Sequence, residues 1–198
     1  MALQHTSSRD PAGFIFLTTE RLILRDHRFS DLTTHHTLLS DPEAMRYLPD
    51  IRTHSPAGSE ENLIASMAEI GREERERYFL RIEEKETGSH IGEIGYTVTD
   101  FTPVGKVVGL GYFTYPRCWN KGYTTEALKE ILRFAFEENN VFRVCTGCVK
   151  ENAGSERVMQ KCGMIREAEC VQRQWHEGKM KDRVEYRMLR EEWLALRP

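Results

Sequence analysis

The sequence lacks any apolar run of the roughly 20 residues that a membrane-spanning helix needs, so we expect no membrane partner. It also lacks a strong excess of one charge. The formal net charge is −3, which argues against general nucleic-acid binding, because that function requires a basic face. Residues 1–11 are polar and have no apolar core of the kind found in a secretory signal. Together these absences predict a cytoplasmic protein without nucleic-acid partners.

The sequence contains few cysteines, and their number is odd. Five cysteines suit a reducing compartment better than a disulfide scaffold. Cys145 and Cys148 have the spacing of a redox or zinc pair, but they fall on a predicted strand, where positions three apart face opposite sides. His35 and His36 are adjacent, so their side chains diverge, and the sequence has no His-Glu-x-x-His motif. We therefore expect no metal site.

The chain does have an ordinary globular composition, with 39% hydrophobic and 30% charged residues. Its 198 residues fit one domain with a substantial core. We expect a flexible N-terminal tail over residues 1–12 and a single domain over residues 13–198. Ser30 and Ser59 are predicted helix caps, and Pro42 fits the first position of a short helix.

Apolar spacing and turn residues predict the order of the elements. A strand comes first, then helices, three strands, a helix, a strand, a helix and a terminal hairpin. The fold class is therefore α+β, with a mixed and largely antiparallel sheet. The predicted strands are residues 14–25, 78–84, 90–100, 106–115, 141–150, 165–175 and 179–189. In the second half of the chain, the predicted helices are residues 125–138 and 152–162.

The most informative segment is the loop Trp119-Asn120-Lys121-Gly122-Tyr123-Thr124, between a predicted strand and a predicted helix. The first N–H groups of a helix have no partner within it, and the helix dipole is positive there. A pyrophosphate fits this position, and a glycine lets backbone approach phosphate closely. Many loops of this composition are plain connections. Thr124 and Thr125 could contribute hydroxyl groups to a phosphate or simply cap the helix.

Four segments carry a resemblance to a known family: residues 19–25, residues 111–128, residues 151–164 and residues 182–193. In this order they resemble the GNAT superfamily of acetyl-CoA-dependent N-acetyltransferases, and within it the branch of ribosomal-protein alanine acetyltransferases. The resemblance implies the GNAT fold, a mixed and mostly antiparallel sheet flanked by helices. It also implies acetyl-CoA as cosubstrate, and it allows a homodimer, which is common among relatives.

The resemblance implies that backbone amides of the loop hold the pyrophosphate. The cofactor-binding residues it implies in the loop are Asn120, Lys121, Gly122, Tyr123, Thr124 and Thr125. Asn120 and Thr124 stand where this branch usually has smaller residues. In the family, a bulge in the preceding strand opens a gap for pantetheine, and an N–H near Phe113 would bind the oxyanion. Tyr115 ends that strand and is also assigned to the cofactor. Alternatively, the strand glycines only make room for an aromatic side chain.

Acetyl transfer also requires that the amine lose a proton. Some family members carry a glutamate at the position that matches Gly109, which this chain lacks. Glu93, on a predicted central strand, is the base we predict in its place. It could instead be a solvated residue on the outer face of the sheet. His90 and Asp182 are further candidates.

The leaving thiolate must be stabilised or protonated. The family's usual tyrosine acid is matched here by Met159, which cannot donate a proton, so the resemblance points to Ser155 instead. Ser155 could also be a first-turn hydroxyl bonded to backbone. Asn152 is expected to cap the helix and to contact pantetheine. Lys161 is expected to complement the negative end of that helix.

The sequence thus predicts an N-acetyltransferase that moves an acetyl group from acetyl-CoA to an amine by direct attack. The acceptor could be a protein N-terminus, an amino acid, a polyamine or an aminoglycoside, chosen by residues 30–75 and the terminal hairpin. A different class of function is also open: a non-catalytic acyl-CoA-binding sensor or scaffold, favoured by the missing acids at Gly109 and Met159. An enzyme for longer acyl groups is a further alternative.

Overall fold

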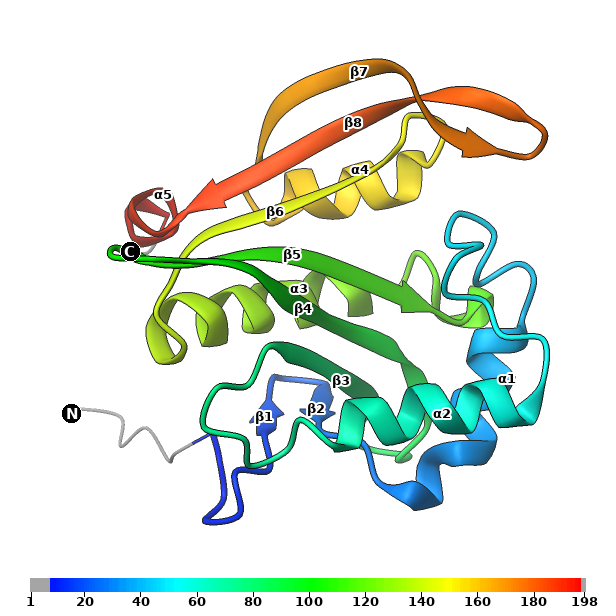
Figure 1. The fold of residues 1–198 in the computed structure, drawn as a ribbon, viewed down its shortest axis with the longest axis vertical. Coiled ribbons are helices and arrows are strands. Elements are labelled where there is room, and N and C mark those ends of the chain that lie inside the picture. Colours follow the sequence, from blue (N-terminus) through cyan, green and yellow to red (C-terminus); the bar gives the residue numbers. More distant parts are fainter. Residues whose placement is uncertain (1–7, 197–198) are drawn as a thin grey trace.

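The computed structural model describes residues 8–196, and they are built around one eight-stranded sheet (Figure 1). Its strands run in the order β1-β2-β3-β4-β5-β6-β8-β7. Only β5 and β6 are parallel neighbours, so the predicted mixed and mostly antiparallel sheet is confirmed. The strands are Phe16–Thr18 (β1), Leu22–Arg25 (β2), Arg77–Glu84 (β3), His90–Thr102 (β4), Gly105–Thr114 (β5), Val141–Val149 (β6), Ile165–His176 (β7) and Lys179–Leu189 (β8).

Five α-helices flank the sheet within residues 8–196. They are Leu32–Ser40 (α1), Pro56–Met67 (α2), Tyr123–Arg133 (α3), Ala153–Lys161 (α4) and Arg190–Ala195 (α5), with a π-helical turn at Phe134–Glu138 and 3-10 turns at Phe29–Asp31 and Pro116–Cys118. None of these described helices is long and apolar enough to cross a membrane.

The two faces of the sheet are covered by different helices. Successive residues of a strand point to opposite faces, and β4 shows this directly. Glu93 contacts His35 of α1, whereas Tyr96 lies on the other face, stacked on Tyr78, which in turn packs against Phe134 at the end of α3. Helices α1 and α2 therefore cover one face, and α3 covers the other (Figure 1).

The main core lies between α3 and the sheet. The buried positions of α3 are spaced three and four residues apart, which puts them on one helical face: Ala127, Leu128, Ile131 and Leu132. Each fully buried leucine or isoleucine stabilises the fold by about 1.5–3 kcal/mol relative to an exposed one. This packing fixes the start of α3 against the end of β5.

The single strand expected over residues 14–25 is wrong, because the segment forms two short antiparallel strands. Thr19 makes the turn between them. Its N–H donates to the Leu22 carbonyl, and its hydroxyl accepts from the Leu22 N–H at 3.0 Å. A threonine that bonds the backbone three residues ahead stabilises such a turn.

Three predicted helix starts also differ. Ser55, not Ser59, caps α2 by accepting from the Gly58 N–H, and Pro56 takes the first helical position. Ser59 is buried inside the helix. Ser30 lies within a 3-10 turn, and the segment after Pro42 forms turns held by Asp41, which accepts from the N–H groups of residues 43 and 44.

The tail expected over residues 1–12 can be followed only in part. Residues 1–7 lie outside the described part of the chain. Ser8 accepts from the Phe16 N–H and donates to Glu138, and Arg9 pairs with Ile15 in a β-bridge. Residues 8–12 are therefore bound to the body of the protein rather than loose.

Candidate functional site

Strands β5 and β6 separate halfway along their length. They pair from Lys106 and Val141 as far as Gly109 and Cys145. Beyond that point β5 continues only beside β4 and β6 only beside β8, so the two strands diverge (Figure 1). The Thr146 hydroxyl donates to the Leu110 carbonyl at 3.0 Å, at the point of separation. We call this opening the fork.

The glycines of β5 do not create the fork through a bulge. The register shift between β5 and β6 lies at Lys106 and Val107, away from the separation. At Gly111 an added Cβ would lie 3.5 Å from the ring of Phe79, an ordinary contact. The ring of Phe79 therefore lies beside Gly111, but its position does not require a glycine there.

The loop before α3 has an open helix start. Gly122 is the N-cap residue, with a φ of +81°, a left-handed conformation that favours glycine. No side chain caps this helix, so its first N–H groups lack the partner that an N-cap side chain provides. Thr124 and Thr125 lie inside the first turn and are not the cap. Asn120 also has a positive φ, +58°, which asparagine tolerates better than most residues.

A hollow of about 300 Å³ adjoins this helix start. Two lysines, Lys129 and Lys161, and two glutamates, Glu20 and Glu126, line it, so the formal charges of the lining balance. An anion at this end of α3 is therefore favoured by the helix dipole and the first N–H groups. The lining residues of the hollow are Glu20, Gly122, Thr125, Glu126, Lys129 and Lys161.

Arg21 braces the loop, a role that the sequence did not reveal. Its Nη1 donates to the Lys121 carbonyl at 3.1 Å, and its Nε donates to Glu126 at 2.7 Å. The guanidinium also lies 4.8 Å from the centre of the Tyr123 ring. The only signal in the sequence was the segment of residues 19–25, in which Arg21 had no assigned task.

Two predicted cofactor residues have side chains already bound within the protein. The Tyr123 hydroxyl donates to Glu84. Tyr115 donates its hydroxyl to the Thr34 carbonyl at 2.8 Å and its N–H to the Ile91 carbonyl at 3.0 Å. Tyr115 therefore ties the end of β5 to α1 and β4, and its side chain has no donor left for a ligand.

Ser155 and a tyrosine that the sequence reading missed meet at the fork. The Ser155 hydroxyl shares a hydrogen bond of 2.9 Å with the hydroxyl of Tyr112, which lies on β5 beyond the separation. Burial raises the pKa of Tyr112, so it stays protonated at neutral pH. Asn152 caps α4 as expected, accepting from the Ser155 N–H at 3.1 Å. A tyrosine directly after a strand glycine, Gly111, was the available signal.

Glu93 lies on the face of β4 beneath α1. It pairs across the sheet with Phe113, which is itself beyond the fork. Its carboxylate is 2.6 Å from His35 Nδ1 and 3.6 Å from His27 Nε2. With the residue only 3% exposed, the alternative of a solvated outer-face side chain is wrong. Burial alone would raise the pKa of Glu93, but the two histidines lower it to about 2.

Of the other two candidates, His90 is near enough to Glu93 for each to shift the pKa of the other, whereas Asp182 has a separate partner. His90 Nε2 is bonded to the Gly92 carbonyl, and Asp182 accepts from the Gln172 N–H. His35 and His36 diverge as expected, because His36 Nδ1 is bonded to the Ser59 hydroxyl at 2.8 Å. Sequence reasoning did not find that His35 meets His27 and Glu93, since the three residues are far apart along the chain.

Comparison with known proteins agrees with this geometry. The family described as acetyltransferase (GNAT) domain matches residues 21–165. The chain is 30% identical over 193 residues to the uncharacterized N-acetyltransferase YnaD of Bacillus subtilis, covering 89% of this chain and 98% of that protein.

Two solved structures share the fold. Ribosomal-protein-S5-alanine acetyltransferase from Vibrio fischeri has a TM-score of 0.78 at 19% identity, covering 93% of this chain and 100% of that one. Spermidine N-acetyltransferase from Vibrio cholerae, in complex with CoA and spermine, has a TM-score of 0.76 at 18% identity, covering 89% and 99%. The predicted GNAT fold is confirmed, and the chain belongs to the GNAT family of acetyltransferases.

Proposed function

We propose that this protein transfers an acetyl group from acetyl-CoA to an amine by direct attack within a ternary complex. The observation that carries the proposal is the adjacency of the fork and the uncapped start of α3, because β5 leads into the loop that α3 follows. A cofactor with a pyrophosphate at one end and a thioester at the other needs both features side by side.

The cofactor would lie with its pyrophosphate on the backbone amides that follow Gly122. Lys129 and Lys161 support this placement, since both line the adjoining hollow. The pantetheine arm would follow β5 into the fork, towards Phe113 on one side and Asn152 on the other. Backbone N–H groups of β5 that have no strand partner there are suitable donors for the thioester oxygen.

The leaving thiolate would be met by Ser155. Tyr112 supports this placement, because its hydroxyl lies within hydrogen-bond distance of both the carbonyl and the hydroxyl of Ser155, at 3.1 and 2.9 Å, and so positions the serine to stabilise the thiolate by a hydrogen bond. This pair replaces the tyrosine that the family usually carries at the position of Met159, which is fully buried here.

The proton of the amine needs an acceptor. Glu93 is the base predicted from the sequence, but its carboxylate faces two buried imidazoles. A general base must reach the proton it removes. We therefore expect solvent to take the proton. A general base contributes about 10²–10⁴-fold to the rate, so a drop of that size in kcat for Glu93→Gln at fixed pH would restore Glu93 as the base.

The acceptor would enter beside α1, α2 and the tip of the β7–β8 hairpin. That tip touches the segment after α1: the ring of His176 stacks on Tyr47 at 4.9 Å, and Glu177 pairs with Arg46 at 2.9 Å. Two acceptor classes are suggested by proteins of the same fold, whose names specify spermidine and a ribosomal-protein alanine.

A thiol-release assay tests the proposal. Protein and acetyl-CoA are mixed with spermidine, a peptide with an N-terminal alanine, free amino acids or an aminoglycoside, and free CoA thiol is followed. We expect release with at least one amine. Tight acetyl-CoA binding without release across the panel would favour the sensor or scaffold module instead.

A further inference from the structure

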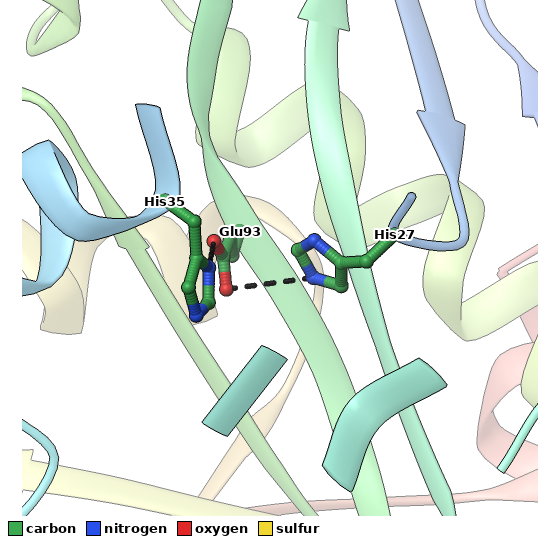
Figure 2. Close-up of side chains that lie close together, drawn as sticks. All are labelled: His27, His35 and Glu93. Carbon is green, nitrogen blue, oxygen red and sulfur yellow. Dashed lines mark hydrogen bonds and ion pairs between the residues drawn. The ribbon is translucent and has the colours of Figure 1, made fainter. Parts of the chain in front are cut away.

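Three residues from separate parts of the chain meet beneath α1. His27 lies two residues after the end of β2, His35 lies in the middle of α1, and Glu93 projects from β4 between them (Figure 2). One ligand atom from each residue lies within 4.8 Å of the other two. The Glu93 carboxylate presents one oxygen to each ring, at 2.6 Å from His35 Nδ1 and 3.6 Å from His27 Nε2. We call these residues the His-Glu-His cluster.

The cluster is closed to solvent, and one of its side chains has no hydrogen-bond partner in the described part of the protein. The exposed fractions of His27, His35 and Glu93 are 2%, 0% and 3%. Neither ring nitrogen of His27 has a hydrogen-bond partner. A buried polar group without a partner costs about 1–3 kcal/mol, so the free energy of folding favours something that occupies the space between His27 and Glu93.

The donor set matches a divalent transition metal. Two imidazole nitrogens and one carboxylate oxygen are ligands that Zn²⁺ accepts. His35 also has the outer contact expected of a metal ligand, because its Nε2 lies 3.2 Å from Asn62 Oδ1. A hydrogen bond there fixes the proton on Nε2 and turns Nδ1 towards the metal.

The charge around the cluster also allows a cation. Arg81 is the nearby positive side chain, and it is neutralised by Glu83 at 2.7 Å and by Asp31 at 3.7 Å. The ion-pair partners of Glu93 among the described residues are the two imidazoles of the cluster, and the nearer one, His35, lies 2.6 Å from its carboxylate. A divalent ion bound here would replace the proton that His35 and Glu93 share.

We propose that His27, His35 and Glu93 bind one divalent transition-metal ion, with Zn²⁺ the best match. The ion joins the segment after β2, helix α1 and strand β4. Its task is structural: it fixes α1 on the sheet, on the side of β4 opposite α3. The site does not depend on acetyl-CoA, and it stands or falls apart from the proposed acetyl transfer.

Metal titration of the chelator-treated protein tests this site. Zn²⁺ is followed by calorimetry, and Co²⁺ by its visible absorption bands. We expect one ion per chain, a higher melting temperature in Zn²⁺, and no thiolate charge-transfer band with Co²⁺. Losing a partner of a ligand costs about 10–100-fold in affinity, so Asn62→Leu should lose that much and His27→Ala more.

His36→Ala is the matched control, because His36 is adjacent to a proposed ligand but is bonded to Ser59. It should bind Zn²⁺ as the wild type does. Glu93→Gln provides a second ligand variant if His27→Ala does not fold. Absence of binding in the wild type, a cobalt–thiolate band, or His27→Ala and Glu93→Gln variants that bind normally would each overturn the proposal.

Discussion

The loop before α3, residues 119–124, and the buried polar layer beneath α1 present different chemical groups. In the proposed cofactor site the loop contributes backbone N–H groups, and the side chains of Asn120 and Lys121 are exposed. In the layer, nearly every partner is a side chain shielded from water. We define the layer as Arg25, His27, Asp31, His35, Arg81, Glu83 and Glu93.

The difference predicts how each region responds to substitution. Backbone donors survive most side-chain changes, so the loop should fail only where a change alters φ or blocks the helix start. In the layer each charge is held by another one. Removing a single partner leaves an uncompensated buried charge, which is far more costly than losing an exposed pair.

The largest expected effect is on stability, in the layer. Arg25 donates two hydrogen bonds to Asp31, at 2.8 and 2.9 Å, and both side chains are 7% exposed. Asp31→Asn should lower the free energy of unfolding by about 3–5 kcal/mol, measured by urea denaturation. Glu177→Gln is the control, since its pair with Arg46 is about half exposed and should cost no more than about 1 kcal/mol. If both variants lowered the free energy of unfolding equally, the proposed difference between buried and exposed ion pairs would be contradicted.

The Arg25–Asp31 pair should make the free energy of unfolding depend on pH. Burial would raise the pKa of Asp31, but the hydrogen bonds from Arg25 and from the Arg28 N–H outweigh it and lower that pKa to about 2. A lowered folded-state pKa gives stability that is fully present above about pH 4 and is lost as the pH falls towards 2. Unfolding between pH 5 and 2 should show a smaller loss in Asp31→Asn than in the wild type.

Cofactor affinity should show the next largest effect, in the loop. Gly122→Glu forces a left-handed conformation on a glutamate and places negative charge at the proposed phosphate site. Acetyl-CoA affinity should fall roughly a hundredfold, which is about 2.7 kcal/mol, measured by calorimetry. Gly178→Glu is the matched control, because Gly178 has a φ of +78° with nothing within 4 Å of an added Cβ. Unchanged affinity in Gly122→Glu would refute the loop assignment.

The loop could be predicted from the sequence and the layer could not, because only the loop is formed by neighbouring residues. The loop is contiguous: a strand, Gly122 and a helix start follow one another within ten residues, and local patterns predict such a unit. The layer joins segments from residues 25 to 93 through the register of β2, β3 and β4. Glu93 was found as a candidate, but nothing local to it indicates that His27 and His35 face it.

Tyr112 and Ser155 were separated for the same reason. Ser155 was found because it follows a helix cap, which is a local signal. Tyr112 lies 43 positions earlier, and only the divergence of β5 from β6 brings the two hydroxyls together. Short-range reasoning also named Ser59 as the cap of α2 where the cap is Ser55, because both serines can cap a helix, and Ser59 is instead bonded to His36.

A moderate effect on turnover is expected at the fork. Ser155→Ala should lower kcat by roughly tenfold to a hundredfold and change KM little, because a hydrogen bond to the leaving thiolate acts in the transition state. Tyr112→Phe should produce a smaller drop. Since the two hydroxyls share one bond, the double variant should be no slower than about the Ser155→Ala protein. Steady-state thiol release measures all three, and strictly multiplicative losses would show that the hydroxyls act independently.

The smallest expected effect is that of Arg21 on acetyl-CoA affinity, and it tests whether the loop depends on its backbone alone. Arg21 contacts the loop from outside through the Lys121 carbonyl, is also bonded to Glu126, and has a side chain that is 44% exposed. Exposed ion pairs contribute about 0–1 kcal/mol, so Arg21→Ala should weaken acetyl-CoA binding by no more than about fivefold. Arg21→Lys should behave similarly, because lysine lacks the planar fork that serves both partners.

The salt dependence of acetyl-CoA binding distinguishes a weak contribution of Arg21 from a strict requirement for it. An exposed brace is screened by ions, so the difference between Arg21→Ala and the wild type should shrink when acetyl-CoA affinity is measured at high ionic strength. A loss comparable to that of Gly122→Glu, unaffected by salt, would mean that the loop depends on a side chain as strictly as the buried layer does. The open helix start would then be made by Arg21 rather than by the backbone alone.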